Sequence, residues 1–156
     1  MTNNEQLIRT FYQSFQNKDY KAMQYCYAED AIFSDAIFKN LDSKQVKAMW
    51  EMLIKRGKDF SLTFDNIKAG ENAGSAEWVA TYTFSATNRK VINHVKANFV
   101  FENNKIMKHS DDFNFYKWSR QALGLPGLLL GWTPFFKSKV RRSALNGLDA
   151  YMKLEK

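Results

Sequence analysis

Two side chains that can exchange protons near neutral pH stand two residues apart late in the chain. His109 and Asp111 lie in a segment in which apolar and polar residues alternate. Residues at i and i+2 of a β-strand point to the same face, so we expect this pair on the face that carries Met107 and Phe113. An imidazole beside a carboxylate supports acid–base catalysis. The pair can equally serve only to satisfy each other's hydrogen bonds, and the sequence leaves both interpretations open.

Other reactive side chains are few. His94 falls on the strand face opposite its apolar neighbours, so we expect it at the surface. The single Cys26 excludes an intrachain disulfide and a multi-cysteine zinc site, and we expect it to be a small buried hydrophobe. No spacing of histidines and carboxylates suggests metal ligands. We therefore expect neither a metal nor a cofactor.

Composition places these side chains in one folded domain. The 156 residues are 45% hydrophobic, 25% charged and 15% aromatic, which suits a single domain with an ordinary core. The net charge of +7 raises the question of nucleic acid, but no nucleic-acid-binding motif accompanies it, so no nucleic-acid partner is expected. The first residues lack the basic and apolar regions of a signal peptide. We expect a soluble, cytoplasmic protein.

Helical spacing dominates the first third of the chain. Residues 3–17 predict an amphipathic helix that begins at a capping box formed by Thr2 and Glu5. Asp19 is a suitable cap for a second, shorter helix. A third helix is framed by Asp42 at its start and Gly57 at its end.

After this helix, the apolar residues no longer recur at helical spacing and instead alternate with polar ones. Alternation predicts strands over 60–64, 78–84, 91–101 and 105–116, separated by turn residues. Strands at hairpin spacing form an antiparallel sheet, here with one face against the helices. Helices followed by strands make the fold class α+β.

This order of elements resembles the nuclear transport factor 2-like, or cystatin-like cone, fold. Residues 27–35, which read YAEDAIFSD, are similar to the Tyr-Ala-Glu-Asp-Ala-x-x-x-Asp segment of ketosteroid isomerases and SnoaL-like polyketide cyclases. Residues 105–124 resemble the last strand and following turn of SnoaL-like proteins. The resemblance implies a cone of N-terminal helices packed on a curved antiparallel sheet over residues 1–120. An apolar flap and an amphipathic helix, residues 121–156, would pack on the same domain.

The resemblance also implies roles for carboxylates. Asp35 stands where ketosteroid isomerases hold the general base that moves a proton between carbons. Asp111 best matches the acid–base aspartate of SnoaL-like cyclases, and its neighbour Asp112 is the alternative. An apolar pocket suits such a carboxylate because it raises the pKa toward neutrality.

The isomerase oxyanion hole is not reproduced. The positions that match its two side-chain donors are Phe11 and Ala97, and neither can donate a hydrogen bond. Tyr12 is one position away, about 100° round the helix. Loss of one such donor costs about 3–4 kcal/mol of transition-state stabilisation in a well-studied enzyme. Steroid isomerisation is therefore disfavoured.

The predicted site is an apolar pocket for a hydrophobic small molecule, with Asp35, His109 and Asp111 as catalytic residues of an isomerase- or cyclase-like proton transfer. Two alternatives stay open, a binding protein without catalysis and a protein-interaction module. In a cone fold, part of the core lines the pocket. The aromatic residues assigned to it are Phe11, Phe15, Phe33, Trp50, Trp78, Tyr82, Phe99 and Phe113.

Two surfaces invite partners. Val79, Ile92 and Val100 would be exposed on the outer sheet face, so we expect a homodimer through that face. Residues 121–136 are uncharged and hold eight large apolar side chains, but glycines and prolines interrupt them and the run is too short to span a membrane. We favour a cap over the pocket mouth. Peripheral membrane contact through residues 121–142, whose end is basic, is the alternative.

Overall fold

The three N-terminal helices begin at the caps that the sequence predicts. In the computed structural model, which describes residues 2–154, α1 (Asn3–Gln16) follows a capping box of Thr2 and Glu5. Asp19 caps α2 (Tyr20–Tyr25) through the backbone N–H of Ala22. Asp42 and Gln45 form a second capping box at α3 (Ser43–Arg56).

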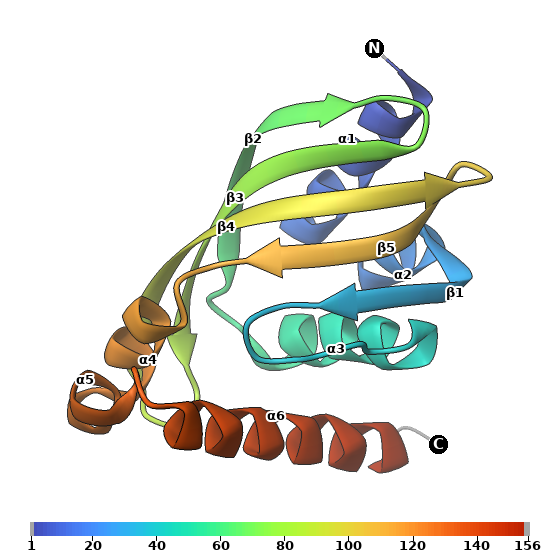
Figure 1. Ribbon diagram of the computed structural model, residues 1–156. Coiled ribbons are helices and arrows are strands. Elements are labelled where there is room, and N and C mark those ends of the chain that lie inside the picture. The colour runs from blue at the N-terminus through green and yellow to red at the C-terminus, as the bar shows by residue number, and fades with distance from the viewer. Residues whose placement is uncertain (1, 155–156) are drawn as a thin grey trace.

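The sheet has five strands, one more than predicted. They are β1 (Tyr27–Ser34), β2 (Ser61–Ala69), β3 (Ala73–Phe84), β4 (Arg89–Glu102) and β5 (Lys105–Asp112), in the order β1-β5-β4-β3-β2 (Figure 1). Strands β2 to β5 pair antiparallel as expected, whereas β1 pairs parallel with β5.

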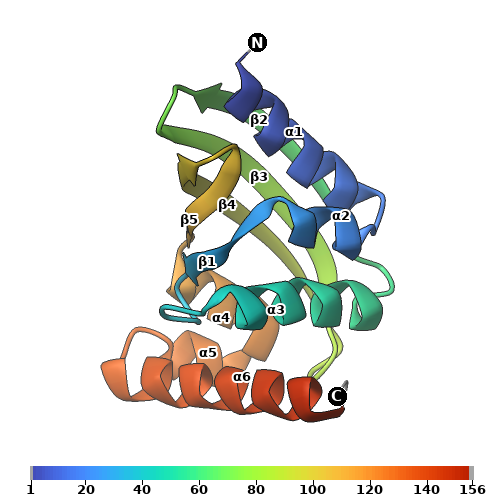
Figure 2. The same cartoon turned by 90° about the vertical axis from the view of Figure 1, so that its right-hand side faces the viewer.

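The extra strand escaped prediction because its pattern is irregular. The register of β1 shifts between Tyr27 and Ile32, and the polar Glu29 and Asp30 interrupt the alternation there. A bulge of this kind removes the period of two on which strand prediction depends. The predicted α+β class and cone architecture are nevertheless confirmed: α1, α2 and α3 lie on one face of the curved sheet (Figure 2).

The C-terminal residues form helices at one end of the sheet. Strand β5 ends at Asp112, earlier than predicted, because Asn114 caps α4 (Phe115–Leu123) through the N–H of Lys117. Two more helices follow, α5 (Leu125–Leu130) and α6 (Pro134–Leu154). Helix α6 runs alongside α3 (Figure 2), where the Tyr151 hydroxyl donates to Glu51 at 2.7 Å.

Only part of the apolar flap packs on the domain. On α4, Phe115, Trp118 and Ala122 form a second small core with Val91. The expectation that the eight large apolar side chains of residues 121–136 pack on the protein is wrong for six of them, because they project from α5 and its flanks into solvent. Those six are Leu125, Leu128, Leu129, Leu130, Trp132 and Phe135.

The outer face of the sheet carries the apolar side chains expected there. Ile92 and Val100 are 43% and 41% exposed, and Val79 is half-buried. The homodimer through this face and the cytoplasmic location stay predictions. Within residues 2–154, no helix is both long and apolar enough to cross a membrane. The predicted cone begins at residue 1 and the predicted C-terminal segment ends at residue 156, and both of these residues lie outside the described part of the chain.

Candidate functional site

Strands β1 and β5 bring the predicted acid–base pair into the centre of the fold. Phe33 of β1 lies opposite His109 of β5 in the parallel register. His109 and Asp111 are both buried on the inner face, while Asp112 is exposed on the outer face. Period-two geometry thus selects Asp111 over Asp112 as the inward carboxylate. Opposite Asp111, on β4, lies Ala97.

A chain of hydrogen bonds ends on this carboxylate. Trp50 donates its indole N–H to the Tyr27 hydroxyl at 2.9 Å, and that hydroxyl lies 2.7 Å from Nδ1 of His109. The other ring nitrogen, Nε2, lies 2.9 Å from Oδ1 of Asp111. Trp78 donates to the same oxygen at 3.5 Å. The chain therefore links α3, β1, β5 and β3.

The donors and acceptors of this chain match when His109 is neutral. An ionised Asp111 can only accept, so Nε2 of the imidazole carries the proton and donates it. Nδ1 then accepts from the Tyr27 O–H, and the Tyr27 oxygen accepts from Trp50. Burial raises the pKa of the Tyr27 hydroxyl well above its ordinary value, which keeps it a donor. The tautomer of the histidine is thus set by its partners.

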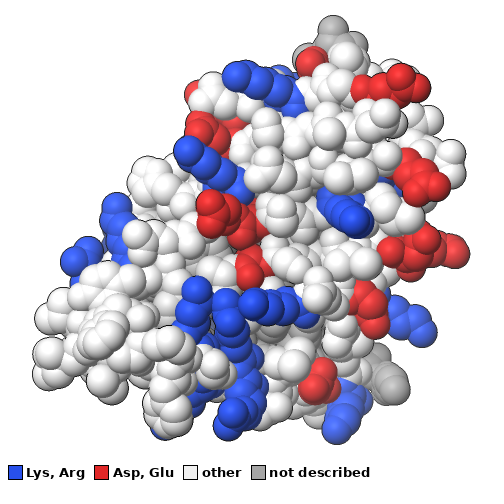
Figure 3. Space-filling view, viewed as in Figure 1, with Lys and Arg blue, Asp and Glu red and all other residues white. Residues whose placement is uncertain are grey.

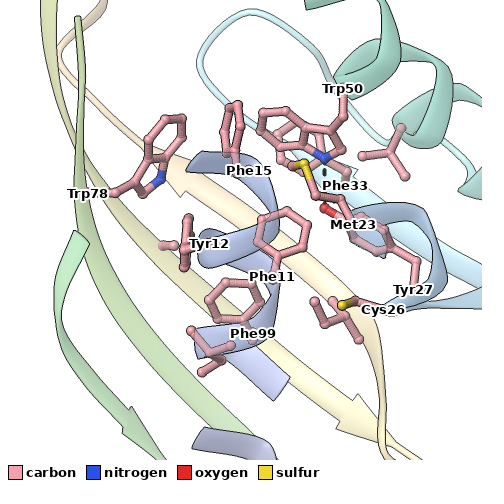
Figure 4. Packing of buried hydrophobic residues seen from close by; sticks show 14 of the residues in the cluster. Phe11, Tyr12, Phe15, Met23, Cys26, Tyr27, Phe33, Trp50, Trp78 and Phe99 are labelled. Carbon is pink, nitrogen blue, oxygen red and sulfur yellow. Dashed lines mark hydrogen bonds between the residues drawn. The ribbon is translucent and has the colours of Figure 1, made fainter. Parts of the chain in front are cut away.

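Aromatic rings enclose the imidazole. The centroids of Phe11, Phe33 and Phe99 lie 5.6, 5.0 and 4.4 Å from that of His109. Figure 4 shows the cluster, with the rings of α1 between Trp78 on one side and Trp50 on the other. Rings packed this closely exclude water, so the hydrogen bonds among them lie in surroundings of low dielectric constant.

One polar group in this cluster has no partner. The hydroxyl of Tyr12 is buried and makes no hydrogen bond with any residue of the described chain. Burial raises its pKa well above the ordinary value, and the negative charge of Asp111 raises it further. A buried donor left without an acceptor costs about 1–3 kcal/mol. Tyr12 is therefore a buried donor, close enough to Asp111 to be affected by its charge, that has no acceptor among residues 2–154.

Asp35 directly follows β1, at the same end of the parallel β1–β5 pair as Asp111. Its Oδ1 accepts from the backbone N–H groups of Ile37 and Phe38 at 2.8 and 2.6 Å, which fixes the turn after β1. Burial raises the pKa of the Asp35 carboxyl from 3.8 to about 6, against the lowering effect of those two hydrogen bonds. The negative charge of Asp111 raises this pKa, and a protonated His109 lowers it. The three predicted catalytic residues thus share one electrostatic neighbourhood, and only His109 and Asp111 are hydrogen-bonded to each other.

The aromatic residues predicted to line a pocket divide into two groups. Five pack in the interior with at most 3% of their surface exposed, and these are Phe11, Phe15, Phe33, Trp50 and Phe99. The other three, Trp78, Tyr82 and Phe113, keep more accessible surface. Asp111 keeps 4% of its side chain accessible while His109 keeps none. Asp111 is therefore the less completely buried member of the pair.

Helix α4 covers that end of the cone. Trp118 donates its indole N–H to the Tyr82 hydroxyl at 2.8 Å. Burial raises the pKa of Tyr82, and the charge of Asp35 contributes to the rise. Behind this contact, Arg141 of α6 donates to the carbonyl of Ala36 at 3.1 Å. Three parts of the chain therefore meet at the mouth of the cone. They are the turn that follows β1, strand β3, and the C-terminal helices.

A separate groove of about 590 Å³ lies on the outer face of the sheet, on the side opposite His109. Both polar and apolar residues line it, and the polar ones include Glu77, His94, Lys96 and Asp112. His94 is exposed there, as predicted. Among residues 2–154, no three His, Cys, Asp or Glu side chains gather as a metal would require.

A cone of helices packed on a curved sheet is the architecture of the nuclear transport factor 2-like class. Within it, the sequence matches the SnoaL-like domain over residues 8–109, well over half of its length, and the chain belongs to that family. No protein of curated function matches the sequence.

Solved structures share the cone. An NTF2-like protein of unknown function from Burkholderia pseudomallei is 17% identical, with a TM-score of 0.66 over 78% of this chain and 98% of that chain. An LEH-like epoxide hydrolase from M. tuberculosis is 18% identical, with a TM-score of 0.66 over 82% and 96%. A candidate polyketide cyclase from Xanthomonas campestris is 16% identical, with a TM-score of 0.64 over 76% and 96%. At these identities the likeness establishes the fold alone.

Sequence reasoning missed three members of the polar cluster. Tyr27 opens the segment that carries the family resemblance, which implies no role for its hydroxyl. The sequence pattern places Trp50 in the pocket wall, although a buried indole N–H also needs an acceptor. Tyr12 does not align with the isomerase donor. Three polar aromatic residues within elements predicted to be buried were the signal that could have identified them.

Proposed function

We propose that the protein binds a small, mostly apolar molecule bearing a carbonyl or similar oxygen and transfers a proton on it. The observation that carries this proposal is the partnerless, buried hydroxyl of Tyr12 beside the His109–Asp111 pair. A carbonyl oxygen of the ligand would supply the missing acceptor. Family membership supports a ligand-binding or isomerase-type role of this general kind.

Asp111 is the group that would take the proton. Both of its hydrogen bonds reach Oδ1, and no described residue donates to Oδ2, which is left for the substrate. When Oδ2 removes a proton from the carbon next to a carbonyl, negative charge develops on the carbonyl oxygen. The Tyr12 hydroxyl, kept protonated by its raised pKa, would donate to that oxygen and stabilise the charge.

His109 and Tyr27 are positioning residues in this scheme. The imidazole holds Oδ1 of Asp111, and the Tyr27 hydroxyl holds the other ring nitrogen, Nδ1, in place. Asp35 is the second carboxyl that would carry the proton, because a pKa of about 6 lets it exchange protons near neutral pH. Since rings fill the interior, we place the ligand toward the mouth, where Trp78, Tyr82 and Phe113 keep accessible surface.

The test uses β-tetralone, an apolar bicyclic ketone with exchangeable hydrogens beside its carbonyl. Proton NMR in deuterium oxide measures how fast the protein exchanges them for deuterium. We expect Asp111→Asn to slow the protein-catalysed exchange by at least about a hundredfold, and Tyr12→Phe to do so by a similar factor. Asp112→Asn makes the same chemical change one residue away on the outer face, and it should leave the rate unchanged. Equal rates for the two asparagine variants would refute the proposal.

A second candidate is binding without catalysis. It is favoured by Phe11 and Ala97, which cannot donate at the positions where the isomerases hold their donors. In that case β-tetralone would shift the NMR signal of the Trp78 indole N–H, and no deuterium would enter the ketone above the buffer rate.

A further inference from the structure

Six large apolar side chains project from one end of the molecule. They are 46% to 81% exposed and fall within eleven consecutive positions. We call them the apolar tip: Leu125, Leu128, Leu129, Leu130, Trp132 and Phe135. Soluble monomers seldom expose a contiguous group of this kind, and where they do, it marks an interaction site.

The tip is held in place by close backbone packing. Helix α5 presents Gly127 and Gly131 to α4, and a Cβ on either would lie 2.0 Å or 2.2 Å from atoms of Ser119. The Tyr116 hydroxyl also donates to the carbonyl of Leu128 at 2.9 Å. The glycines thus occupy the protein-facing side, and the leucines are left on the outside. This is the reverse of the arrangement in which a surface helix buries its apolar stripe.

The surroundings of the tip are basic. Between residues 113 and 148 the sequence holds six Lys or Arg and no Asp or Glu. Lys117 and Arg120 lie on α4, and Lys139 and Arg142 follow on α6, all four exposed. In Figure 3, blue side chains border the white protrusion formed by this end of the molecule. A partner for this end must therefore be both apolar and anionic.

Basic and apolar side chains together line a hollow beside the tip. It measures about 380 Å³, and Arg89, Arg120, Leu125 and Leu128 are among the residues that line it. Two guanidinium groups beside two leucines offer charge to an anionic headgroup and apolar contact to the chains attached to it. Trp132, 72% exposed, carries a ring of the type that concentrates at the level of lipid headgroups.

We propose that the apolar tip inserts into the surface of an anionic phospholipid bilayer, with the basic side chains around it held at the headgroups. Short amphipathic segments bind membranes in this way, through apolar burial and attraction to anionic lipids together. Insertion removes the leucines, Trp132 and Phe135 from water, which the fold itself does not do. The charged rim makes the attachment selective for anionic lipid and sensitive to salt.

The first test measures binding of the full chain to vesicles of phosphatidylcholine alone or mixed equally with phosphatidylserine. We expect co-sedimentation with the mixed vesicles that falls as salt is raised, and little with the neutral ones. The variant Leu129→Ser/Leu130→Ser/Phe135→Ser should bind the mixed vesicles roughly a hundredfold more weakly. Its matched control is Ile92→Ser/Val100→Ser, which removes exposed apolar side chains from the outer sheet face and should bind as the parent does.

A second test measures whether the tip enters the bilayer, and whether the basic side chains give the preference for anionic lipid. Lipids with brominated chains quench nearby tryptophans, and Trp132 is the exposed one, since Trp50, Trp78 and Trp118 are buried. We expect quenching that disappears in Trp132→Phe. Lys139→Glu/Arg142→Glu, at exposed positions, should lose the preference for anionic vesicles while keeping the parent's thermal unfolding curve.

Three results would overturn the proposal. One is the absence of binding to the mixed vesicles, and another is equal binding to neutral and anionic vesicles. The third is a tip-dependent dimer in solution without vesicle binding, which would mean that a second copy covers the tip. None of these results bears on the proton-transfer chemistry, which is measured without lipid.

Discussion

The interior of the cone and the apolar tip are built from the same kinds of residue and treat them in opposite ways. Around His109, phenylalanines pack edge to face, and the tyrosine and tryptophan heads form a chain of hydrogen bonds. At the tip, leucines and aromatic rings face solvent. Composition alone therefore does not decide burial. What separates the two regions is which side of each helix lies against the protein.

Their charges differ as well. The interior holds the carboxyls of Asp35 and Asp111 beside His109, whereas the surroundings of the tip are basic only. Buried carboxyls favour a ligand that can exchange a proton, and exposed cations favour an anionic surface. One small domain thus presents two candidate sites of opposite charge, one of them inside the cone and the other on its C-terminal helices.

The largest expected effect is on the free energy of unfolding, which should depend on side chains of the interior far more than on side chains of the tip. Phe11→Ala removes a fully buried ring that contacts His109, Tyr12 and Tyr27. The free energy of unfolding, measured by urea denaturation, should fall by about 3–5 kcal/mol because a cavity remains. Leu129→Ala, at the tip, should change it by less than about 0.5 kcal/mol. A comparable loss for Leu129→Ala would mean that the tip is packed in solution.

A second prediction follows from the pKa of Asp35. Its folded value of about 6 exceeds the ordinary value of 3.8, so the folded protein binds this proton more tightly than the unfolded chain does. Stability therefore decreases as pH rises through that interval, by at most about 3 kcal/mol from this group. Above the upper value, both states are ionised and the contribution is constant. Urea midpoints across the acidic range measure the slope.

Asp35→Asn isolates this contribution. The asparagine oxygen can still accept from Ile37 and Phe38, so the turn is kept, while the titration is removed. The variant should be more stable than the parent at neutral pH and equal to it well below the lower pKa. If the two curves run parallel across the whole range, the carboxyl is solvated and the proposed role of Asp35 at the mouth is wrong.

A third prediction concerns the hydrogen-bonded chain. Tyr27→Phe leaves the Trp50 indole N–H and Nδ1 of His109 without partners in a buried site. We expect a loss of about 1–3 kcal/mol in the free energy of unfolding. Nitrogen NMR should also show a changed chemical shift for Nδ1 of His109, which loses its hydrogen bond, while Nε2 keeps its proton toward Asp111. Tyr25→Phe deletes the hydroxyl of an exposed tyrosine nearby and serves as the control, with no change in either measurement.

Most of the fold could be predicted because its local signals agree. The capping residues Thr2, Asp19 and Asp42 start helices where expected, and alternation in β4 matches its burial. Strand β1 could not be predicted in the same way, since its pairing with β5 is non-local and its bulge removes the alternation. The helix over Phe115–Leu123 was also missed, because alternation up to residue 116 continued the strand pattern past the cap at Asn114.

The candidate site was predictable only in part. Period-two spacing was enough to place His109 and Asp111 together, because both lie on one strand. The contributions of Tyr12 and Tyr27 depend on where separate elements meet in space, which spacing along the chain does not encode. The exposure of the tip was hidden for another reason. Leucines normally outrank glycines for burial, and only the contact with Ser119 shows that the glycines take the inner side here.

The smallest expected effect compares two neighbouring residues at the start of α6, where the two regions meet. Phe136 packs against the small core formed by α4 and β4, whereas Phe135 is 81% exposed. Phe136→Ala should lower the free energy of unfolding by about 1–2 kcal/mol, less than for a fully buried ring. Phe135→Ala should change it by less than about 0.5 kcal/mol. Binding to vesicles that contain phosphatidylserine should show the reverse order, since only Phe135 reaches the lipid. If one of the two substitutions weakens both stability and binding while the other weakens neither, folding and membrane contact depend on the same face of α6, and the separation between the two regions fails.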